Sequence, residues 1–243
     1  MQIDLNADVG EGYATDTQLI PLLSSANICC GAHAGSQALT ASTLDICASF
    51  GVAAGAHPSY PDRASFGRQR LALSDNALAD SLSQQLDAFK SLCANRAMPV
   101  HHVKPHGALY NDVIKDQQLA QLLLDTVQRV FPKVSLMTLP FGALFELCHA
   151  RQIPVITEGF ADRQYQADGT LTPRSQPNAL LTGHAAVTQA LKLASGAAIA
   201  GMTTPLTVQS ICVHGDSQDA VQLAQTIRQQ LLQRGVCITK VYP

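Results

Sequence analysis

Polar and ionisable side chains recur along the sequence, and most of them come directly after a short run of apolar residues. Histidines, carboxylates, a lysine and arginines of this kind can transfer protons, bind an anion or hold a metal ion. The candidate site residues are Asn6, Asp8, Glu11, His33, His57, Lys104, His106, Tyr110, Glu158, Asp162, Arg163, Arg174, His214 and Asp216.

Two kinds of chemistry fit this set: metal-assisted hydrolysis and acid–base chemistry without a metal. The sequence has no H-E-x-x-H or similarly dense ligand spacing, so a metal site would need ligands from separate strands, and metal binding stays open. Lys104, Arg163 and Arg174 suit an anionic substrate or a phosphoryl group. A nucleotide would need a nonstandard site or a partner subunit, because G-x-x-x-x-G-K-[ST] and G-x-G-x-x-G are both absent.

The apolar runs that precede these residues predict seven strands that alternate with helical segments. This order is typical of parallel βα units. The predicted strands cover residues 2–6, 26–30, 51–57, 100–105, 134–139, 153–157 and 210–214. Polar groups follow six of them, all except the fifth. Because the carboxyl ends of parallel strands meet at one edge, we expect these groups to converge there.

The segments between the strands have helical spacing of their apolar residues. Two amphipathic helices are predicted around residues 78–92 and 119–130, and a third runs from an N-cap candidate at Asp216 to a terminating Gly235. Units of this kind in 243 residues fit either a closed barrel or a doubly wound sheet, and the pattern alone does not choose between them. We expect a single domain over residues 1–243, with long irregular loops at 58–72 and 159–178, and loops of this length are usually functional or disordered.

Several candidates also have a purely structural explanation. Asp216 could serve only as a helix cap, and Ser36 and Asp116 are predicted caps. His101 and His102 alternate across a strand, so at most one of them points inward, and we expect a structural role for both. Six polar strand ends out of seven nevertheless exceed what independent caps and core histidines would produce.

The composition excludes several classes of partner. The formal net charge is −2 with no basic run, which argues against binding to nucleic acid or to an anionic membrane. The N-terminal residues lack the features of a signal peptide and no apolar stretch is long enough to span a membrane, so we expect a cytoplasmic protein. Seven cysteines without C-x-x-C spacing indicate neither a disulfide framework nor a zinc ribbon.

With these motifs assembled, the sequence resembles the LamB/YcsF family over nearly its whole length. The resemblance rests on IDLNADVGE (3–11), SANICCGAHAG (25–35), GVAAGAHPSYPD (51–62), FGR (66–68), HVKPHGALYN (102–111), EGFADRQYQADGTLTPRSQP (158–177) and ICVHGD (211–216). It implies a seven-stranded β/α barrel related to the glycoside hydrolase/deacetylase barrels. It also implies a subunit of the prokaryotic 5-oxoprolinase, which works with two further subunits, B and C.

The reaction implied by the resemblance converts 5-oxo-L-proline, ATP and water to L-glutamate, ADP and phosphate. A five-membered lactam is a poor electrophile, so phosphorylation of the amide oxygen would assist ring opening. We expect Asp8, His57, Lys104 and His106 to be catalytic and the other candidate site residues to bind substrate. Two alternatives stay open: a metal-dependent, deacetylase-like hydrolase that uses no ATP, and a noncatalytic subunit that only delivers 5-oxoproline to its partners.

Overall fold

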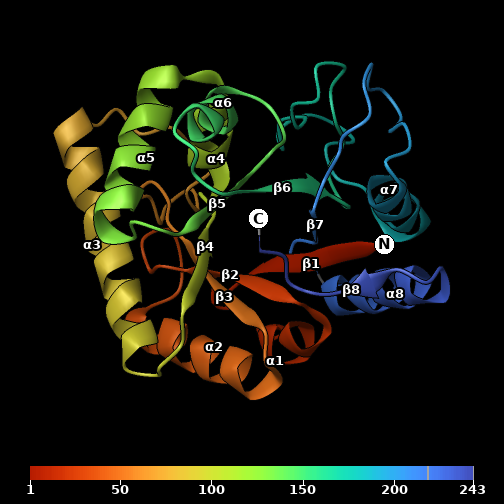
Figure 1. The fold of residues 1–243 in the computed structure, drawn as a ribbon, viewed down its shortest axis with the longest axis horizontal. Helices are drawn as coiled ribbons and strands as arrows, with labels where there is room; N and C mark the ends of the chain where they lie inside the picture. Colours follow the sequence, from red (N-terminus) through yellow and green to blue (C-terminus); the bar gives the residue numbers. More distant parts are fainter. Residues whose placement is uncertain (218, 243) are drawn as a thin grey trace.

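Seven parallel strands form a closed barrel in the computed structural model, which describes residues 1–217 and 219–242 (Figure 1). Each strand pairs with its neighbour in chain order, and β1 closes the ring by pairing with both β2 and β7. The strands are β1 (Gln2–Val9), β2 (Ser25–Cys29), β3 (Ala53–His57), β4 (Val100–Val103), β5 (Ser135–Thr138), β6 (Val155–Phe160) and β7 (Ser210–Cys212). The closed barrel expected from the family resemblance is therefore confirmed.

One further short strand was not predicted. It is β8 (Cys237–Ile238), which pairs with Gln2 and Ile3 at the start of β1. Near the other end of β1, Asn6 to Val9 pair with β2 instead. The C-terminal segment thus packs beside the first strand without entering the closed ring.

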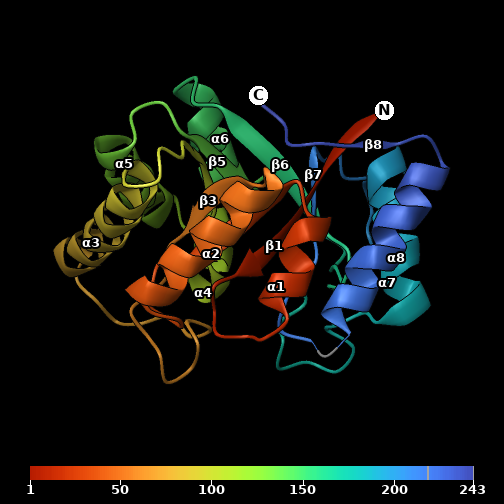
Figure 2. The same ribbon diagram turned by 90° about the horizontal axis from the view of Figure 1, so that it is seen from below.

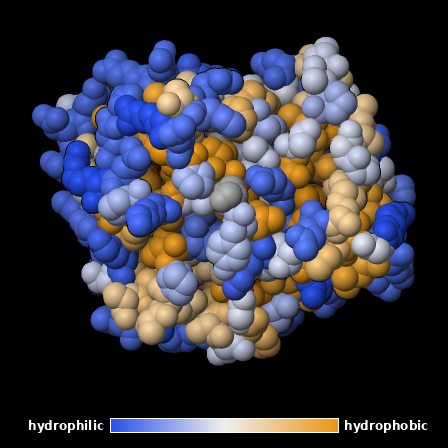
Figure 3. Space-filling model, in the orientation of Figure 1, coloured by the Kyte–Doolittle hydropathy of each residue, from blue (hydrophilic) through white to orange (hydrophobic). Residues whose placement is uncertain are grey.

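Helices surround the barrel, as the view from below shows (Figure 2). They are α1 (Asp16–Leu19), α2 (Gln37–Phe50), α3 (Asp75–Ala94), α4 (Gly107–Lys115), α5 (Gln117–Val130), α6 (Ala143–Ala150), α7 (Gly183–Ser195) and α8 (Ala220–Gln233), with a 3₁₀ turn η1 (Ile20–Leu22) after α1. The predicted apolar stripes of α3 and α5 are buried, except that Leu92 and Leu122 are half-buried. Hydrophilic side chains cover the left margin of Figure 3, where Figure 1 places these two helices. Among the described residues, none of the helices combines the length and the apolar character of a membrane-spanning segment.

The N-terminal helix caps agree with the sequence in two cases and differ in one. The hydroxyl of Ser36 accepts the N–H of Leu39, and the carboxylate of Asp116 accepts the N–H of Leu119. The predicted N-cap at Asp216 is wrong: α8 begins after Asp219. Asp216 instead forms ion pairs with two arginines of the long loops. At the other end of α8, Gly235 has the expected left-handed φ of 72°.

A hydrogen-bonded column of polar side chains runs along the inside of the barrel. On β1, Asp4, Asn6 and Asp8 point to the interior, because strand side chains alternate between faces. Asn6 Nδ2 donates to Ser210 Oγ at 2.7 Å, and Ser210 in turn donates to Asp4. Asn27 Nδ2 bridges Asn6 Oδ1 at 2.7 Å and Asp8 Oδ1 at 2.8 Å. The column connects the base of the barrel to the end that carries the candidate site.

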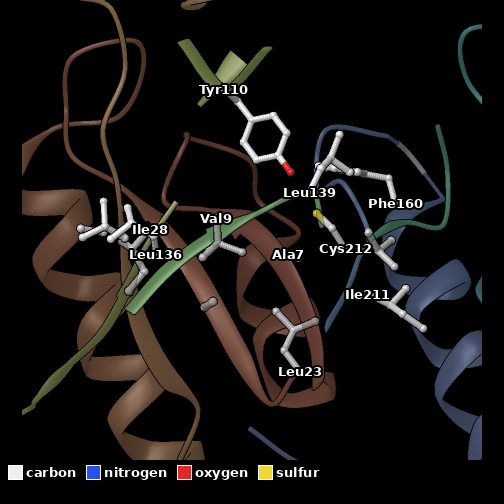
Figure 4. Close-up of a cluster of buried hydrophobic side chains, with 14 of the residues drawn as sticks. Ala7, Val9, Leu23, Ile28, Tyr110, Leu136, Leu139, Phe160, Ile211 and Cys212 are labelled. Carbon is white, nitrogen blue, oxygen red and sulfur yellow. The ribbon is translucent and has the colours of Figure 1, made fainter. Parts of the chain in front are cut away.

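The apolar core lies between the barrel and its helices. Leu5, Ala7 and Val9, on the opposite face of β1, are fully buried in it. Figure 4 shows buried apolar side chains near the site, where the Tyr110 hydroxyl points toward Cys212. Cys212 and Phe160 lie on the inner side of the barrel wall, beside Lys104 Nζ. The outer layer is therefore apolar, whereas the interior is mostly polar.

Candidate active site

A cavity of about 640 Å³ opens at the carboxyl ends of the barrel strands. The two long loops, at residues 58–72 and 159–178, contribute parts of its wall, including Phe66, Arg68 and Thr170. Residues at or after the ends of five strands thus surround one space, as parallel strand order requires. Ten of the predicted site residues line it: Asp8, Glu11, His57, Lys104, His106, Tyr110, Arg163, Arg174, His214 and Asp216.

Asp8 and Lys104 form an ion pair at the floor of this cavity. Lys104 Nζ lies 3.1 Å from Asp8 Oδ1, and the lysine is only 1% exposed. Burial alone would raise the pKa of Asp8, but His57 and Lys104 outweigh it and hold that pKa well below its usual value. Burial opposes the charge of Lys104, yet Asp8, Cys212 and Glu158 hold its pKa well above the usual value. Both side chains are therefore charged in the folded protein.

Glu158 supports Lys104 from behind the cavity wall. Its Oε2 lies 3.0 Å from Lys104 Nζ, and the residue is fully buried. Burial raises the pKa of Glu158, and the adjacent Lys104 ammonium opposes that rise. The sequence placed Glu158 after the sixth strand, whereas β6 continues to Phe160 and directs Glu158 into the barrel. Tyr110, at the start of α4, lies on the same side of the site and packs its ring 5.6 Å from that of Phe160.

Three histidines lie against one another beside Asp8. The rings of His33 and His106 stack at 3.7 Å, and the ring of His57 meets that of His106 edge-on at 4.9 Å. His57 Nε2 lies 3.4 Å from Asp8 Oδ2 and 3.0 Å from His106 Nδ1. Glu11 Oε1 completes the cluster, 3.0 Å from His33 Nε2 and 3.6 Å from His106 Nδ1.

Burial controls the protonation of this cluster. It lowers the pKa of His33 to about 3 and the pKa of His106 well below its usual value, with neighbouring histidines adding to both shifts. Burial, together with the charge of Asp8, raises the pKa of Glu11 to about 8. Neutral imidazoles and a carboxyl that titrates near neutrality can accept and release protons.

Two sets of ligand atoms in the cluster are close enough to share a metal ion. One comprises Asp8, His57 and His106, and the other comprises Glu11, His33 and His106. Within each set the ligand atoms lie within 4.8 Å of one another. Separate strands therefore assemble the ligands that the sequence shows in no local motif.

His214 forms a second histidine–carboxylate pair, with Asp162, on the opposite wall. Its Nδ1 lies 2.8 Å from Asp162 Oδ1, and its backbone N–H donates to Asp162 Oδ2 at 2.9 Å. Burial opposes ionisation of Asp162, but His214 outweighs it and lowers the pKa of that carboxyl. Because an ionised Asp162 binds the Nδ1–H, Nε2 is the nitrogen that His214 can present to the cavity.

Arg163 is a buried arginine in the wall of the cavity. Arg163 is 6% exposed and donates to the carbonyl oxygens of Thr172 and Ala179. Burial, with the nearby Arg174, lowers the pKa of Arg163 to about 10. Within residues 1–217 and 219–242, no carboxylate oxygen lies within 4.0 Å of its guanidinium nitrogens. A buried guanidinium without a carboxylate partner is a natural place for a ligand anion.

Asp216 connects the two long loops across the cavity mouth. Its Oδ2 accepts from Arg68 Nη2 at 2.6 Å and from Arg174 Nη1 at 2.8 Å. Arg68 belongs to the first loop and Arg174 to the second. The same carboxylate thus holds both loops at the rim.

Four predicted substrate-binding residues lie behind the wall, and three of them contact residues that line the cavity directly. Glu158 supports Lys104, Asp162 holds His214, and His33 contacts both Glu11 and His106. Asn6 reaches Asp8 through Asn27. Their position suits orientation of the lining residues.

Three residues of the site were missed in the sequence. Arg68 was noticed only within the FGR motif, and Asn27 lies inside an apolar strand. His102, for which a structural role was predicted, is fully buried and places Nε2 2.6 Å from Asn27 Oδ1. A Cβ on Gly55 would overlap the same nitrogen, so the glycine makes room for the ring. Asn27 could have been identified in the sequence because, like Asn6, it is a polar residue inside an apolar strand.

Comparison with known proteins gives relatives over the full length of the chain. A protein from Haemophilus influenzae (strain PittEE), named as the A subunit of 5-oxoprolinase, is 41% identical over 242 residues, covering 98% of this chain and 99% of the relative. A protein of the same name from Carboxydothermus hydrogenoformans is 41% identical over 243 residues, covering 97% of this chain and 96% of the relative.

Solved structures give a consistent result. A lactam utilization protein from Thermus thermophilus superposes with a TM-score of 0.90 at 33% identity, covering 99% of this chain and all of the other. A family 4 carbohydrate esterase from Streptomyces lividans shares the fold at a TM-score of 0.57 and 11% identity, covering 100% of this chain and 93% of the esterase chain. The family model described as LamB/YcsF matches residues 3–243. The chain belongs to the LamB/YcsF family.

Proposed function

We propose that this chain is the lactam-binding subunit of a 5-oxoprolinase and that its cavity opens the ring of 5-oxo-L-proline to give L-glutamate. The observation that carries the proposal is the presence of Arg163, buried without a carboxylate partner among the described residues, in the cavity that also contains Asp8, Lys104 and the histidine cluster. The names of the full-length relatives support the same reaction.

The substrate suits the charges of this cavity. Its single carboxylate would bind the guanidinium of Arg163, whose planar fork matches a carboxylate. Lys104 is held between Asp8 and Glu158 and would donate a hydrogen bond to the lactam oxygen, where negative charge develops. Tyr110 and Arg174 line the remaining contact surface.

Ring opening requires two proton movements. Water loses a proton as its oxygen adds to the lactam carbon, and the ring nitrogen gains a proton as the C–N bond breaks. We assign the first transfer to Asp8, His57 and His106, which lie together at the floor. His214, oriented by Asp162 on the opposite wall, suits delivery of the second proton. Each such group contributes typically ~10²- to 10⁴-fold to the rate.

ATP is assigned in this proposal to the assembly with subunits B and C. The sequence has no phosphate-binding loop of a familiar type, which supports the assignment of ATP to the assembly and not to this chain alone. Phosphorylation of the amide oxygen would turn a stable lactam into a better electrophile before water attacks.

The test combines the purified chain with candidate B and C subunits and measures glutamate and ADP formed from 5-oxoproline. We expect both products to form together and only when all components are present. Failure of a complete, folded mixture to couple them would contradict the proposal. A chain that only delivers substrate would retain coupling after the substitution His106→Ala in an intact assembly. A deacetylase-like hydrolase would act without ATP.

A further inference from the structure

We propose that Asp8 Oδ2, His57 Nε2 and His106 Nδ1 form a binding site for a divalent transition-metal ion of the zinc type. The inference deepens the proposed function, on which the ion's chemical role rests, whereas binding of the ion depends only on this chain. Three residues from three different strand ends supply the ligands.

The hydrogen bonds on the outer side of both histidines determine which nitrogens carry hydrogen. His57 Nδ1 lies 2.7 Å from the carbonyl oxygen of Lys104, and His106 Nε2 lies 2.9 Å from that of Phe66. A carbonyl oxygen can only accept, so the N–H of each neutral ring must be on this outer nitrogen. When both rings are neutral, as metal binding requires, the inner nitrogens His57 Nε2 and His106 Nδ1 therefore carry lone pairs.

These two lone-pair nitrogens face each other at 3.0 Å, and Asp8 Oδ2 lies 3.4 Å from His57 Nε2. Three electron-rich atoms this close repel one another unless a cation lies among them. Ligand atoms roughly 2.0–2.1 Å from a tetrahedral zinc ion are about 3.3 Å apart, which matches both spacings. Backbone carbonyls that hold the outer N–H of a ligating histidine are also the usual support of such sites.

The hydrogen bonds of the Asp8 carboxylate likewise leave one of its atoms available to the ion. Asp8 Oδ1 accepts from Asn27 Nδ2 at 2.8 Å and from Lys104 Nζ at 3.1 Å, which leaves Oδ2 for the ion. The positive charge of Lys104 is balanced from its other side by Glu158, at 3.0 Å. The aspartate is therefore not neutralised fully by the lysine.

The ligand types and the access both favour a catalytic type of site. Imidazole nitrogens with one carboxylate suit zinc and its neighbours better than magnesium or calcium, which prefer oxygen ligands. Asp8, His57 and His106 all line the cavity, so a fourth coordination position would be open to water or substrate. An ion held there would occupy the atoms of Asp8, His57 and His106 that the ion-free site would use to take a proton from water. It would assist the same step by lowering the pKa of bound water, or it would polarise a carbonyl group.

The test uses the full chain, freed of metal by a chelator and then titrated with Zn²⁺ in a calorimeter, with metal content measured after dialysis. We expect one equivalent to bind to the wild-type chain. Loss of an outer partner of a metal ligand typically costs ~10- to 100-fold in affinity, so His57→Ala and His106→Ala should each weaken binding by at least roughly 100-fold. His149→Ala, on the exposed face of α6, is the matched control and should leave binding unchanged.

Two further measurements keep the result decisive. Co²⁺ should give the visible absorption bands of a tetrahedral site in the wild-type chain, which requires no variant to fold. His33→Ala separates the proposed site from the adjacent set of Glu11, His33 and His106. No binding to the wild-type chain, as expected if a proton is shared between the two rings, would overturn the inference. Zinc binding that persists in the His57→Ala variant but is lost in a folded His33→Ala variant would also overturn the inference.

The outcome is independent of the test of the proposed function. Metal binding is measured on the isolated chain without ATP or other subunits. One equivalent of zinc bound by a chain that fails to support glutamate release would contradict the 5-oxoprolinase proposal alone. Coupled glutamate release by a chain that binds no metal would contradict only this inference.

Discussion

The Lys104 ammonium lies 3.0 Å from Glu158 Oε2, and neither residue is more than 1% exposed. The same ammonium contacts Asp8 from the cavity side at 3.1 Å. Glu158 therefore fixes the position of a charge that faces the cavity, without lining the cavity itself. Contacts of this kind allow a residue behind the wall to affect the chemistry inside the cavity.

Glu158→Gln should destabilise the folded chain by about 3–5 kcal/mol, because breaking a buried ion pair leaves the remaining charge poorly compensated. Urea denaturation measures the change. Asp125→Asn is the matched control: its pair with Arg151 is largely exposed and should contribute under about 1 kcal/mol. Equal effects of the two substitutions would contradict the structural role assigned to Glu158.

Glu11 should make stability depend on pH. Its pKa is raised to about 8 in the folded chain by burial and by the charge of Asp8, against an ordinary value of 4.5. Between these values the folded state binds more protons than the unfolded state, so this residue's contribution to the free energy of unfolding falls as pH rises. Glu11→Gln removes that dependence, and the variant should gain stability relative to wild type from pH 5 to pH 8, by on the order of a few kcal/mol.

The measurement for Glu11 is the free energy of unfolding of both proteins across this range, with a chelator present. Glu146→Gln on the exposed surface of α6 serves as the control and should run parallel to wild type. A stability difference between Glu11→Gln and wild type that does not change with pH would show that the carboxyl is ionised in the folded chain.

Asp216→Ala should loosen the rim of the cavity with little effect on global stability. The substitution removes the shared acceptor of Arg68 and Arg174, while partly exposed ion pairs contribute at most about 1 kcal/mol each. We expect faster tryptic cleavage within residues 58–72 and 159–178, and only a small decrease in the midpoint of denaturation. Cleavage at the wild-type rate would mean that the carboxylate does not hold the loops.

Asp162→Asn should lower kcat for glutamate release by ~10²-fold or more, with a smaller change in KM. The asparagine can bind the backbone N–H of His214 but no longer fixes the ring with Nε2 toward the cavity. Kinetics of the complete assembly measure the effect, with Asp168→Asn in the same loop as control, because the side chain of Asp168 accepts from Thr170 and not from a residue of the cavity floor. Wild-type kcat in the Asp162 variant would remove His214 from the proton transfer.

The sequence was informative about the strands and the polar groups at their ends. Local alternation predicts that His57 and Lys104 end adjacent strands, and parallel order then brings them to one edge. Barrel closure could not be predicted from pattern, because it depends on β1 pairing with β7 through Asp4 to Asn6 as well as with β2. Only the resemblance indicated it.

The errors arise where a long-range partner decides the outcome. Asp216 has the residue type of a helix cap, but Arg68, 148 positions away in the sequence, binds its carboxylate. Glu158 follows a run of strand-forming residues, and the strand continues through it because Glu158 to Phe160 pair with β7 while Lys104 compensates the buried carboxylate. Propensity is local, whereas a buried charge is placed by its partner.

The most direct test of the central claim measures 5-oxoproline-dependent glutamate release by the complete assembly containing Asp8→Asn in this chain. Asp45→Asn, at an exposed pair with Arg96, is the matched control. If the lactam is opened in this cavity, the Asp8 variant assembles normally but releases glutamate at least ~10²-fold more slowly, while the control retains the wild-type rate. Wild-type glutamate release by an assembly that contains the folded Asp8 variant would place the ring opening elsewhere.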